Sequence, residues 1–217
     1  MISVTLKNTA LNFFTDATLF SPCSIDKGTL AMLSVVDFSM EDKVLDLGCG
    51  YGVVGILAAK LIGPERVVMC DILPQAVECA RKNAALNEVA EVSIKVSNGY
   101  DNIPDNDFTI ILSNPPYHAD FSVPKHFIEE GFRKLVHGGK MVMVTKRLTW
   151  YKRKLTAVFG GVKVIAKDGY YIFVAEKRKD YASKQKKCPK KLSKKLQRKK
   201  LNHSRACAAR RTKIRQL

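Results

Sequence analysis

The sequence lacks several features that would assign it to common protein classes. None of its six cysteines forms a C-x-x-C pair, so a zinc ribbon or a thioredoxin-like redox site gains no support. No apolar run approaches the roughly 20 residues that a membrane-spanning helix needs. Residues 1–7 lack the charged-then-apolar layout of a secretory signal. We therefore expect a cytoplasmic protein with no membrane span, no bound metal and cysteines that are core residues or free thiols.

Acidic residues are almost absent from the last 41 positions. Residues 177–217 contain 18 Lys+Arg and one acid, Asp180, whereas residues 1–176 contain 19 Lys+Arg and 19 Asp+Glu. The whole net charge of +17 therefore lies in this tail. The charge boundary predicts three parts, which are an N-terminal cap segment (1–40), a globular domain (41–177) and a basic tail (178–217).

A tail of one charge sign attracts polyanions, because each phosphate that it neutralises releases bound counterions. We expect it to bind RNA, with Lys190, Lys194 and Arg198 among its contacts. It is expected to be disordered alone, and to form a basic amphipathic helix when bound. The same composition would also suit a solubilising extension, a membrane surface or a nuclear-import signal.

Short apolar runs alternate with helical patterns from about residue 40. The runs lie at 44–47, 66–70, 92–96, 108–112, 141–145, 162–166 and 170–175, and the helical patterns at 53–61, 74–86 and 124–135. This alternation predicts an α/β fold with an open, mostly parallel sheet and helices on both faces. Asp168-Gly169 predicts a closing antiparallel hairpin, and Gly138-Gly139 is expected to end the third helix. Residues 1–40, with a helix at 27–36, are expected to cap the sheet edge or a cofactor cleft.

A glycine-rich turn follows the first of these runs. It lies in the segment Asp46-Leu47-Gly48-Cys49-Gly50-Tyr51-Gly52, and Asp71 closes the second run 21 residues after Gly50. A sheet of this kind binds ligands beyond the carboxyl ends of its strands, and a carboxylate there can accept hydrogen bonds from both hydroxyls of a ribose. A dinucleotide motif would need glycine where Val53 stands. Asp46 would repel a pyrophosphate but could meet a cationic amino-acid group, which favours S-adenosylmethionine.

At these residues the chain resembles the class I methyltransferases, whose first motif is an acidic residue followed by glycines. The resemblance implies S-adenosylmethionine as cofactor and gives each position a role. Asp46, Gly48 and Gly50 would line its methionine portion, Asp71 would hold the ribose, Ile72 would pack on the adenine, and Asn98 would lie near the adenine edge.

A second motif, Ser113-Asn114-Pro115-Pro116-Tyr117, follows the fourth run beside the predicted cofactor cleft, so Asn114 is also expected to border the cofactor. The prolines make the segment stiff. The Asn114 side-chain oxygen and the Pro115 carbonyl can accept both N–H groups of an exocyclic amine, and can stabilise the charge that grows on its nitrogen. Tyr117 can stack on a flat substrate, and His118 is a further candidate contact. We therefore predict catalysis by Asn114, Pro115 and Tyr117.

From about residue 20 to residue 177 the chain resembles the RsmC-like ribosomal RNA guanine-N2 methyltransferases, of which it would be a small, single-domain relative. The resemblance rests on 19–22, 25–28, 46–52, 113–118, 135–140 and 168–171. It implies a seven-stranded Rossmann-like sheet and the N2 amine of a guanine in ribosomal RNA as substrate. The same N-P-P-Y motif would also suit an adenine-N6 or a protein-glutamine N5 methyltransferase. A catalytically inactive RNA-binding module is the alternative from another class.

Overall fold

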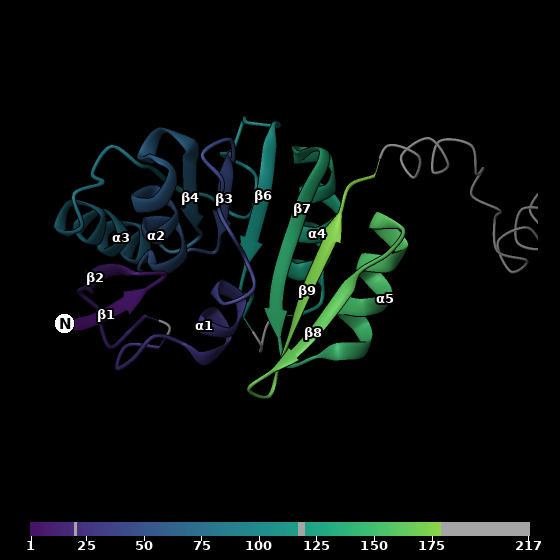
Figure 1. Ribbon diagram of the computed structural model, residues 1–217, viewed down its shortest axis with the longest axis horizontal. Helices are drawn as coiled ribbons and strands as arrows, with labels where there is room; N and C mark the ends of the chain where they lie inside the picture. Colours follow the sequence, from purple (N-terminus) through teal and green to yellow (C-terminus); the bar gives the residue numbers. More distant parts are fainter. Residues whose placement is uncertain (20, 117–119, 179–217) are drawn as a thin grey trace, which may run out of the picture. The chain divides into compact units, whose positions relative to one another are not determined.

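The apolar runs of the sequence form one sheet in the computed structural model (Figure 1), which describes residues 1–19, 21–116 and 120–178. In this part of the chain seven strands pair in the order β5-β4-β3-β6-β7-β9-β8. The strands are β3 (Val44–Leu47), β4 (Val67–Asp71), β5 (Ser93–Val96), β6 (Phe108–Ser113), β7 (Leu135–Thr145), β8 (Lys163–Lys167) and β9 (Tyr170–Glu176).

Strands β5, β4, β3, β6 and β7 are parallel, whereas β9 is antiparallel to both β7 and β8. The predicted mostly parallel sheet with an antiparallel C-terminal hairpin is therefore confirmed. The chain passes from β3 to β4 on one side and later returns to β6 on the other. This change of direction opens a crevice at the carboxyl ends of β3 and β6, where open α/β sheets bind their ligands.

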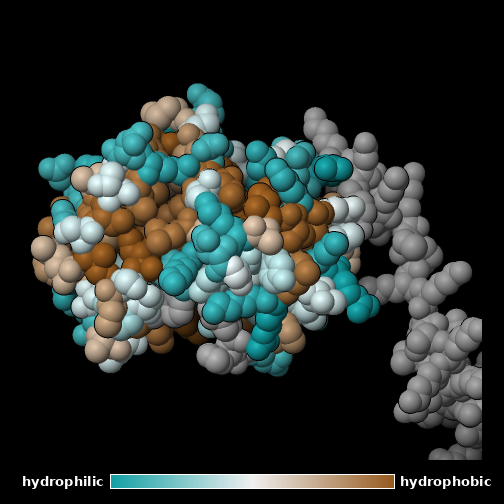
Figure 2. All heavy atoms as spheres, turned by 60° about the horizontal axis from the view of Figure 1, so that its bottom comes forward, coloured by the Kyte–Doolittle hydropathy of each residue, from teal (hydrophilic) through white to brown (hydrophobic). Residues whose placement is uncertain are grey.

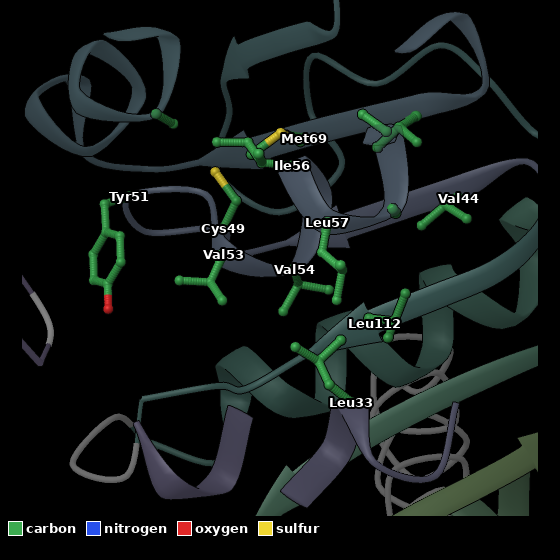
Figure 3. Packing of buried hydrophobic residues seen from close by; sticks show 14 of the residues in the cluster. Leu33, Val44, Cys49, Tyr51, Val53, Val54, Ile56, Leu57, Met69 and Leu112 are labelled. Atoms are coloured by element: carbon green, nitrogen blue, oxygen red, sulfur yellow. The ribbon is translucent and has the colours of Figure 1, made fainter. Parts of the chain in front are cut away.

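Helices cover both faces of the sheet. Helices α1 (Lys27–Leu33), α2 (Val53–Ile62) and α3 (Pro74–Leu86) share one apolar core with one set of strand residues, and α4 (Ser122–Lys134) and α5 (Leu148–Phe159) share a second core with the alternate residues. A short 3-10 helix, η1 (Pro64–Arg66), links α2 to β4. In the first core, Val54 and Leu57 of α2 face Leu112 of β6 and Leu33 of α1 (Figure 3). Burial on both faces explains why the central strands β3, β4 and β6 are mainly apolar runs.

The N-terminal segment begins with a two-stranded hairpin, β1 (Ile2–Leu6) and β2 (Thr9–Phe13), which the sequence pattern did not predict. It is fastened to α3 by two buried asparagines. The Asn87 side chain accepts a hydrogen bond from the Asn12 amide (2.9 Å) and donates one to the Asn12 carbonyl (2.7 Å), and Asn83 accepts from the Phe14 amide (2.7 Å). The hairpin therefore packs on the α2–α3 side, while α1 packs against β7 and β9.

One expectation needs correction, and one helix was missed. Gly138-Gly139 does not end a helix, because α4 ends at Lys134 and β7 already begins at Leu135. The glycines lie inside β7, next to a register shift between β6 and β7 that takes up the additional residues. Helix α5 was also not predicted, although Tyr151, Leu155 and Phe159 recur at helical spacing and are buried. In the described ranges, no helix has both the length and the apolar character that crossing a membrane requires.

Candidate active site

The loop between β3 and α2 forms the floor of the site. Gly48 and Gly50 have φ angles of +79° and +55°, in the left-handed region that favours glycine. The amides of Gly48 and Cys49 both donate to the Cys70 carbonyl at 2.9 Å, which ties the loop to the end of β4. A Cβ atom added at Gly48 or Gly50 would meet no protein atom within 4 Å. The glycines therefore let the backbone turn and leave open space above it.

Asp71, at the end of β4, fixes the middle of this loop. One carboxylate oxygen accepts from the Gly50 amide (2.9 Å) and the other accepts from the Leu73 amide (3.0 Å). The side chain is half-buried and lines the cavity described below. Each carboxylate oxygen has a second lone pair, so Asp71 can hold the loop and still accept from a ligand hydroxyl.

Asp46 lies deeper than expected for a residue that contacts a ligand. Its side chain is 4% exposed, and its carboxylate accepts from the Gly55 amide (2.8 Å) in the first turn of α2. Burial raises the pKa of Asp46 to about 7, the Gly55 bond opposes that change, and the charge of Asp71 adds to it. Asp46 does not belong to the described residues that line the cavity. Its carboxylate lies at the positive end of α2, the helix that follows the glycine loop.

A cavity of about 310 Å³ opens over the carboxyl ends of β3, β4 and β6. Its walls are mainly apolar. Figure 2 shows the molecule with this end turned forward, and two hydrophobic areas there lie on either side of a hydrophilic strip. Ile72 is 59% exposed on one wall, and Asn98 is an exposed polar residue there. The cavity is lined by Leu47, Gly48, Gly50, Cys70, Asp71, Ile72, Leu73, Ser97, Asn98, Gly99, Asn114, Pro115, Pro116, Val123 and Phe127.

The segment after β6 forms the opposite wall. The Ser113 hydroxyl donates to the Leu47 carbonyl (2.8 Å), which locks the end of β6 to the end of β3. Asn114 follows, and its amide N–H groups donate to Asp26 Oδ2 (2.8 Å) and Thr29 Oγ1 (3.1 Å) at the start of α1. Pro115 is buried and lines the cavity. The structure thus brings seven predicted site residues around one cavity, namely Gly48, Gly50, Asp71, Ile72, Asn98, Asn114 and Pro115. Asp46 is buried and is not among the described residues that line it.

The remaining predicted site residues lie outside the described part of the chain: Tyr117, His118, Lys190, Lys194 and Arg198. The ionisable residues among the described cavity walls are Cys70 and Asp71. Burial raises the pKa of the Cys70 thiol to about 12, so this thiol stays protonated and is a poor nucleophile at neutral pH. No group of three or more His, Cys, Asp or Glu side chains that could hold a metal ion occurs in residues 1–19, 21–116 and 120–178.

Two polar residues at the site were not singled out individually from the sequence, Asp26 and Thr29. Asp26 caps α1 by accepting from the Thr29 amide (2.8 Å), and both side chains contact Asn114. Asp26 precedes Thr29 by three residues, the spacing at which an aspartate that caps a helix accepts a hydrogen bond from a backbone amide of the first turn. That pattern reveals the cap, but not the contact with a residue 88 positions away.

Comparison with known proteins supplies a family for this architecture. Residues 10–175 match the model of the methyltransferase small domain. The chain is 33% identical over 157 residues to ribosomal RNA small subunit methyltransferase C of Serratia proteamaculans, a match that covers 70% of this chain and 45% of that protein. It is 30% identical over 176 residues to ribosomal RNA large subunit methyltransferase G of Klebsiella pneumoniae, covering 78% and 47%. The chain therefore spans about half the length of these relatives.

The fold is also that of a solved structure. A 16S rRNA N2 methyltransferase of Thermus thermophilus, in complex with AdoMet and guanosine, superposes with a TM-score of 0.73 at 23% identity, over 82% of this chain and 50% of that one. At this level of identity the likeness concerns the arrangement of the sheet and its helices. It agrees with the strand order found here.

Proposed function

The chain belongs to the methyltransferase small domain family, whose members use S-adenosylmethionine, and on that premise we propose that it methylates an exocyclic amine, in particular the N2 amine of a guanine in ribosomal RNA. The observation that carries the proposal is the position of Asn114 and Pro115 across one cavity from Asp71. A cofactor held at Asp71 and a base held at Asn114 would share that cavity, so the methyl group and the accepting nitrogen would lie side by side.

The cofactor half of the cavity suits a nucleoside that carries an amino acid. The Asp71 carboxylate would accept from the ribose hydroxyls, and the exposed face of Ile72 would pack on the adenine ring, with Asn98 at its edge. The open space above Gly48 and Gly50 would admit the methionine portion. Bound in this way, S-adenosylmethionine supplies an electrophilic methyl group on a sulfonium.

The acceptor half would act by position and electrostatics. The Asn114 side-chain oxygen and the Pro115 carbonyl would each accept one N–H of the amine and aim its lone pair at the methyl group. As the new C–N bond formed, the bond between the methyl group and the sulfonium would break and S-adenosylhomocysteine would leave. The nitrogen would become positive, both acceptors would stabilise it, and its extra proton would pass to water after transfer. Among the described wall residues the ionisable groups are Cys70, whose thiol is protonated, and Asp71 on the cofactor side. The reaction needs no proton removal before attack.

The substrate class follows from the relatives and from the charge of the chain. Both relatives are described by name as ribosomal RNA methyltransferases, and the structural neighbour was solved with guanosine. The basic tail, with its 18 Lys+Arg between 177 and 217, would hold the polyanion while the cavity receives one base. In this proposal the described domain carries out methyl transfer, and the tail provides affinity for RNA.

The test is methyl transfer from labelled S-adenosylmethionine to four acceptors in parallel, namely unmodified ribosomal particles, naked ribosomal RNA, DNA and protein. We expect label on a guanine N2 of the ribosomal RNA. Asn114→Ala should lower kcat about 100-fold or more without loss of cofactor affinity, whereas Asn106→Ala, in an exposed loop at the amino end of β6, should not change kcat. Label on adenine or on glutamine would mean that this group, and not guanine, is the substrate. Full turnover in Asn114→Ala would refute the proposed chemistry, and cofactor binding without transfer to any acceptor would indicate an inactive module.

A further inference from the structure

Asn114 is held by a helix that lies outside the sheet. Its two amide N–H groups donate to Asp26 Oδ2 (2.8 Å) and Thr29 Oγ1 (3.1 Å), both in the first turn of α1 or its cap. Thr29 is 9% exposed and Asp26 is half-buried, so water competes weakly for these bonds. The contacts join residues 88 and 85 positions apart.

The Asp26 carboxylate decides which way the Asn114 amide faces. A carboxylate accepts hydrogen bonds and donates none. If the amide turned over, its oxygen would face Asp26 Oδ2 at hydrogen-bonding distance, and two acceptors would oppose each other. In the observed orientation the Asn114 Nδ2–H groups donate to residues at the start of α1. The Oδ1 atom is the other branch of the same amide, so it does not face Asp26 Oδ2. An exocyclic amine needs an acceptor from Asn114, and the reversed amide would offer it a donor instead.

We propose that Asp26, assisted by Thr29, is a positioning residue that keeps Asn114 oriented as a hydrogen-bond acceptor for the substrate amine. This inference rests on the proposed function. Asp26 contributes charge as well as geometry, because a carboxylate that accepts from an amide N–H polarises that amide and strengthens its oxygen as an acceptor. The strengthening matters most when the amine nitrogen becomes positive during transfer.

Asp26 is itself held from three directions. The oxygen that accepts from Asn114 also accepts from the Thr29 amide (2.8 Å), and the other oxygen accepts from the Tyr170 hydroxyl (3.4 Å) at the start of β9. Gly28 lets α1 lie this close, since a Cβ atom there would be 2.7 Å from the Tyr170 ring and 2.8 Å from Asp26 Oδ2. The carboxylate therefore has little room to leave Asn114. The segments around 26–29, 114 and 170 form one unit.

Four variants at positions 26 and 29 separate the contact with Asn114 from the cap of α1. Asp26→Ser keeps a good cap residue but is too short to reach Asn114. Asp26→Asn keeps a side-chain oxygen that can accept from the Thr29 amide and from Asn114, but removes the negative charge. Thr29→Val removes the hydroxyl that Asn114 donates to and keeps the backbone amide that the cap needs, while Thr29→Ser restores a hydroxyl. Asp16→Ser is the matched control, because it removes an exposed aspartate that accepts from Thr18 in the same N-terminal segment.

We expect Asp26→Ser to lower kcat about 10- to 100-fold, the scale that misplacement of a reacting group costs, and Thr29→Val to lower it less. Asp26→Asn should lie between wild type and Asp26→Ser. The dissociation constant for S-adenosylhomocysteine should stay within about twofold in each of these variants, Thr29→Ser should recover most of the rate, and Asp16→Ser should match wild type. A uniform loss of cofactor affinity and rate, without recovery in Thr29→Ser, would mean that these residues only maintain the fold, and would overturn the proposal.

A second measurement does not depend on turnover. The side-chain amide protons of Asn114, identified in NMR spectra by their loss in Asn114→Ala, should exchange with water at least about tenfold faster in Asp26→Ser than in wild type. Unchanged exchange would show that Asp26 does not hold the amide. Faster exchange with an unchanged kcat would also overturn the positioning role. If wild type methylates no acceptor, the proposed function fails, and the exchange rates still decide whether Asp26 holds Asn114.

Discussion

Asp46 makes the stability of this protein depend on pH in a direction opposite to that of an ordinary surface carboxylate. It is 4% exposed and accepts one backbone hydrogen bond, from Gly55. Burial raises its pKa from 3.8 to about 7. The folded state therefore binds the Asp46 proton more tightly than the unfolded chain does. This contribution to stability is complete below about pH 4 and is lost as the pH rises to about 7.

The size of the effect follows from the two pKa values. The gap between 3.8 and about 7 corresponds to about 4 kcal/mol of unfolding free energy, at about 1.4 kcal/mol for each pKa unit. Asp46→Asn keeps an oxygen that can accept from Gly55 and removes the ionisation. The free energy of unfolding of this variant, minus that of wild type, should therefore increase by up to about 4 kcal/mol between pH 4 and pH 8.

Urea denaturation followed by circular dichroism, at half-unit steps between pH 4 and pH 8.5, would measure this difference. Glu41→Gln, an exposed carboxylate before β3, serves as the matched control for the loss of one acid. A difference between Asp46→Asn and wild type that stays constant over the whole range would refute the reasoning. It would mean that the glycine loop and the start of α2 stabilise the ionised carboxylate as well as water does.

Two more predictions concern the two kinds of ligand. Asp71→Ala should raise the dissociation constant for S-adenosylhomocysteine about 10- to 100-fold in calorimetry, since a hydrogen bond to a charged acceptor contributes about 1.5–3 kcal/mol. If the variant and wild type bound S-adenosylhomocysteine equally well, Asp71 would only hold the loop through Gly50. Deletion of 178–217 should weaken RNA binding and flatten its dependence on salt, by about 0.7 in the logarithmic slope for each phosphate of a single strand that the tail neutralises. A slope that does not change would leave the tail a solubilising role.

The strands were predictable because their signal is local. The central strands β3, β4 and β6 are short, mainly apolar runs, and burial on both faces keeps these runs continuous. The edge strands β5 and β8 are partly exposed and contain more polar residues. The N-terminal hairpin escaped for an equally local reason. Its turn residues, Lys7 and Asn8, have φ angles of +46° and +62°, the backbone of a tight hairpin turn. Asparagine is common there and lysine is not, so the pair gives no clear turn signal.

The missed helix α5 has a different cause. It starts after Arg147 without a side-chain cap, and its sequence contains tryptophan, tyrosine, threonine, valine and phenylalanine, residues that are more typical of strands. Its helical form depends on packing of Tyr151, Leu155 and Phe159 into the second core. Tertiary packing therefore determines that this segment is a helix. The four-residue spacing of these three side chains was the one local indication of a helix in the sequence.

The two halves of the cavity depend on the chain in different ways. On the cofactor side, Asp71 accepts from Gly50, in the loop after β3, and from Leu73, just before α3. These residues lie within or beside one β3–α2–β4 unit, so the sequence motif already contains most of the geometry. On the acceptor side, the orientation of Asn114 depends on Asp26 and Thr29, in a helix that packs on β7 and β9. A glycine loop can therefore form wherever the sheet forms, whereas an oriented amide requires the N-terminal segment to be docked. We therefore expect cofactor affinity to depend on residues at the ends of the strands, and the transfer rate to depend in addition on the N-terminal segment that contacts Asn114.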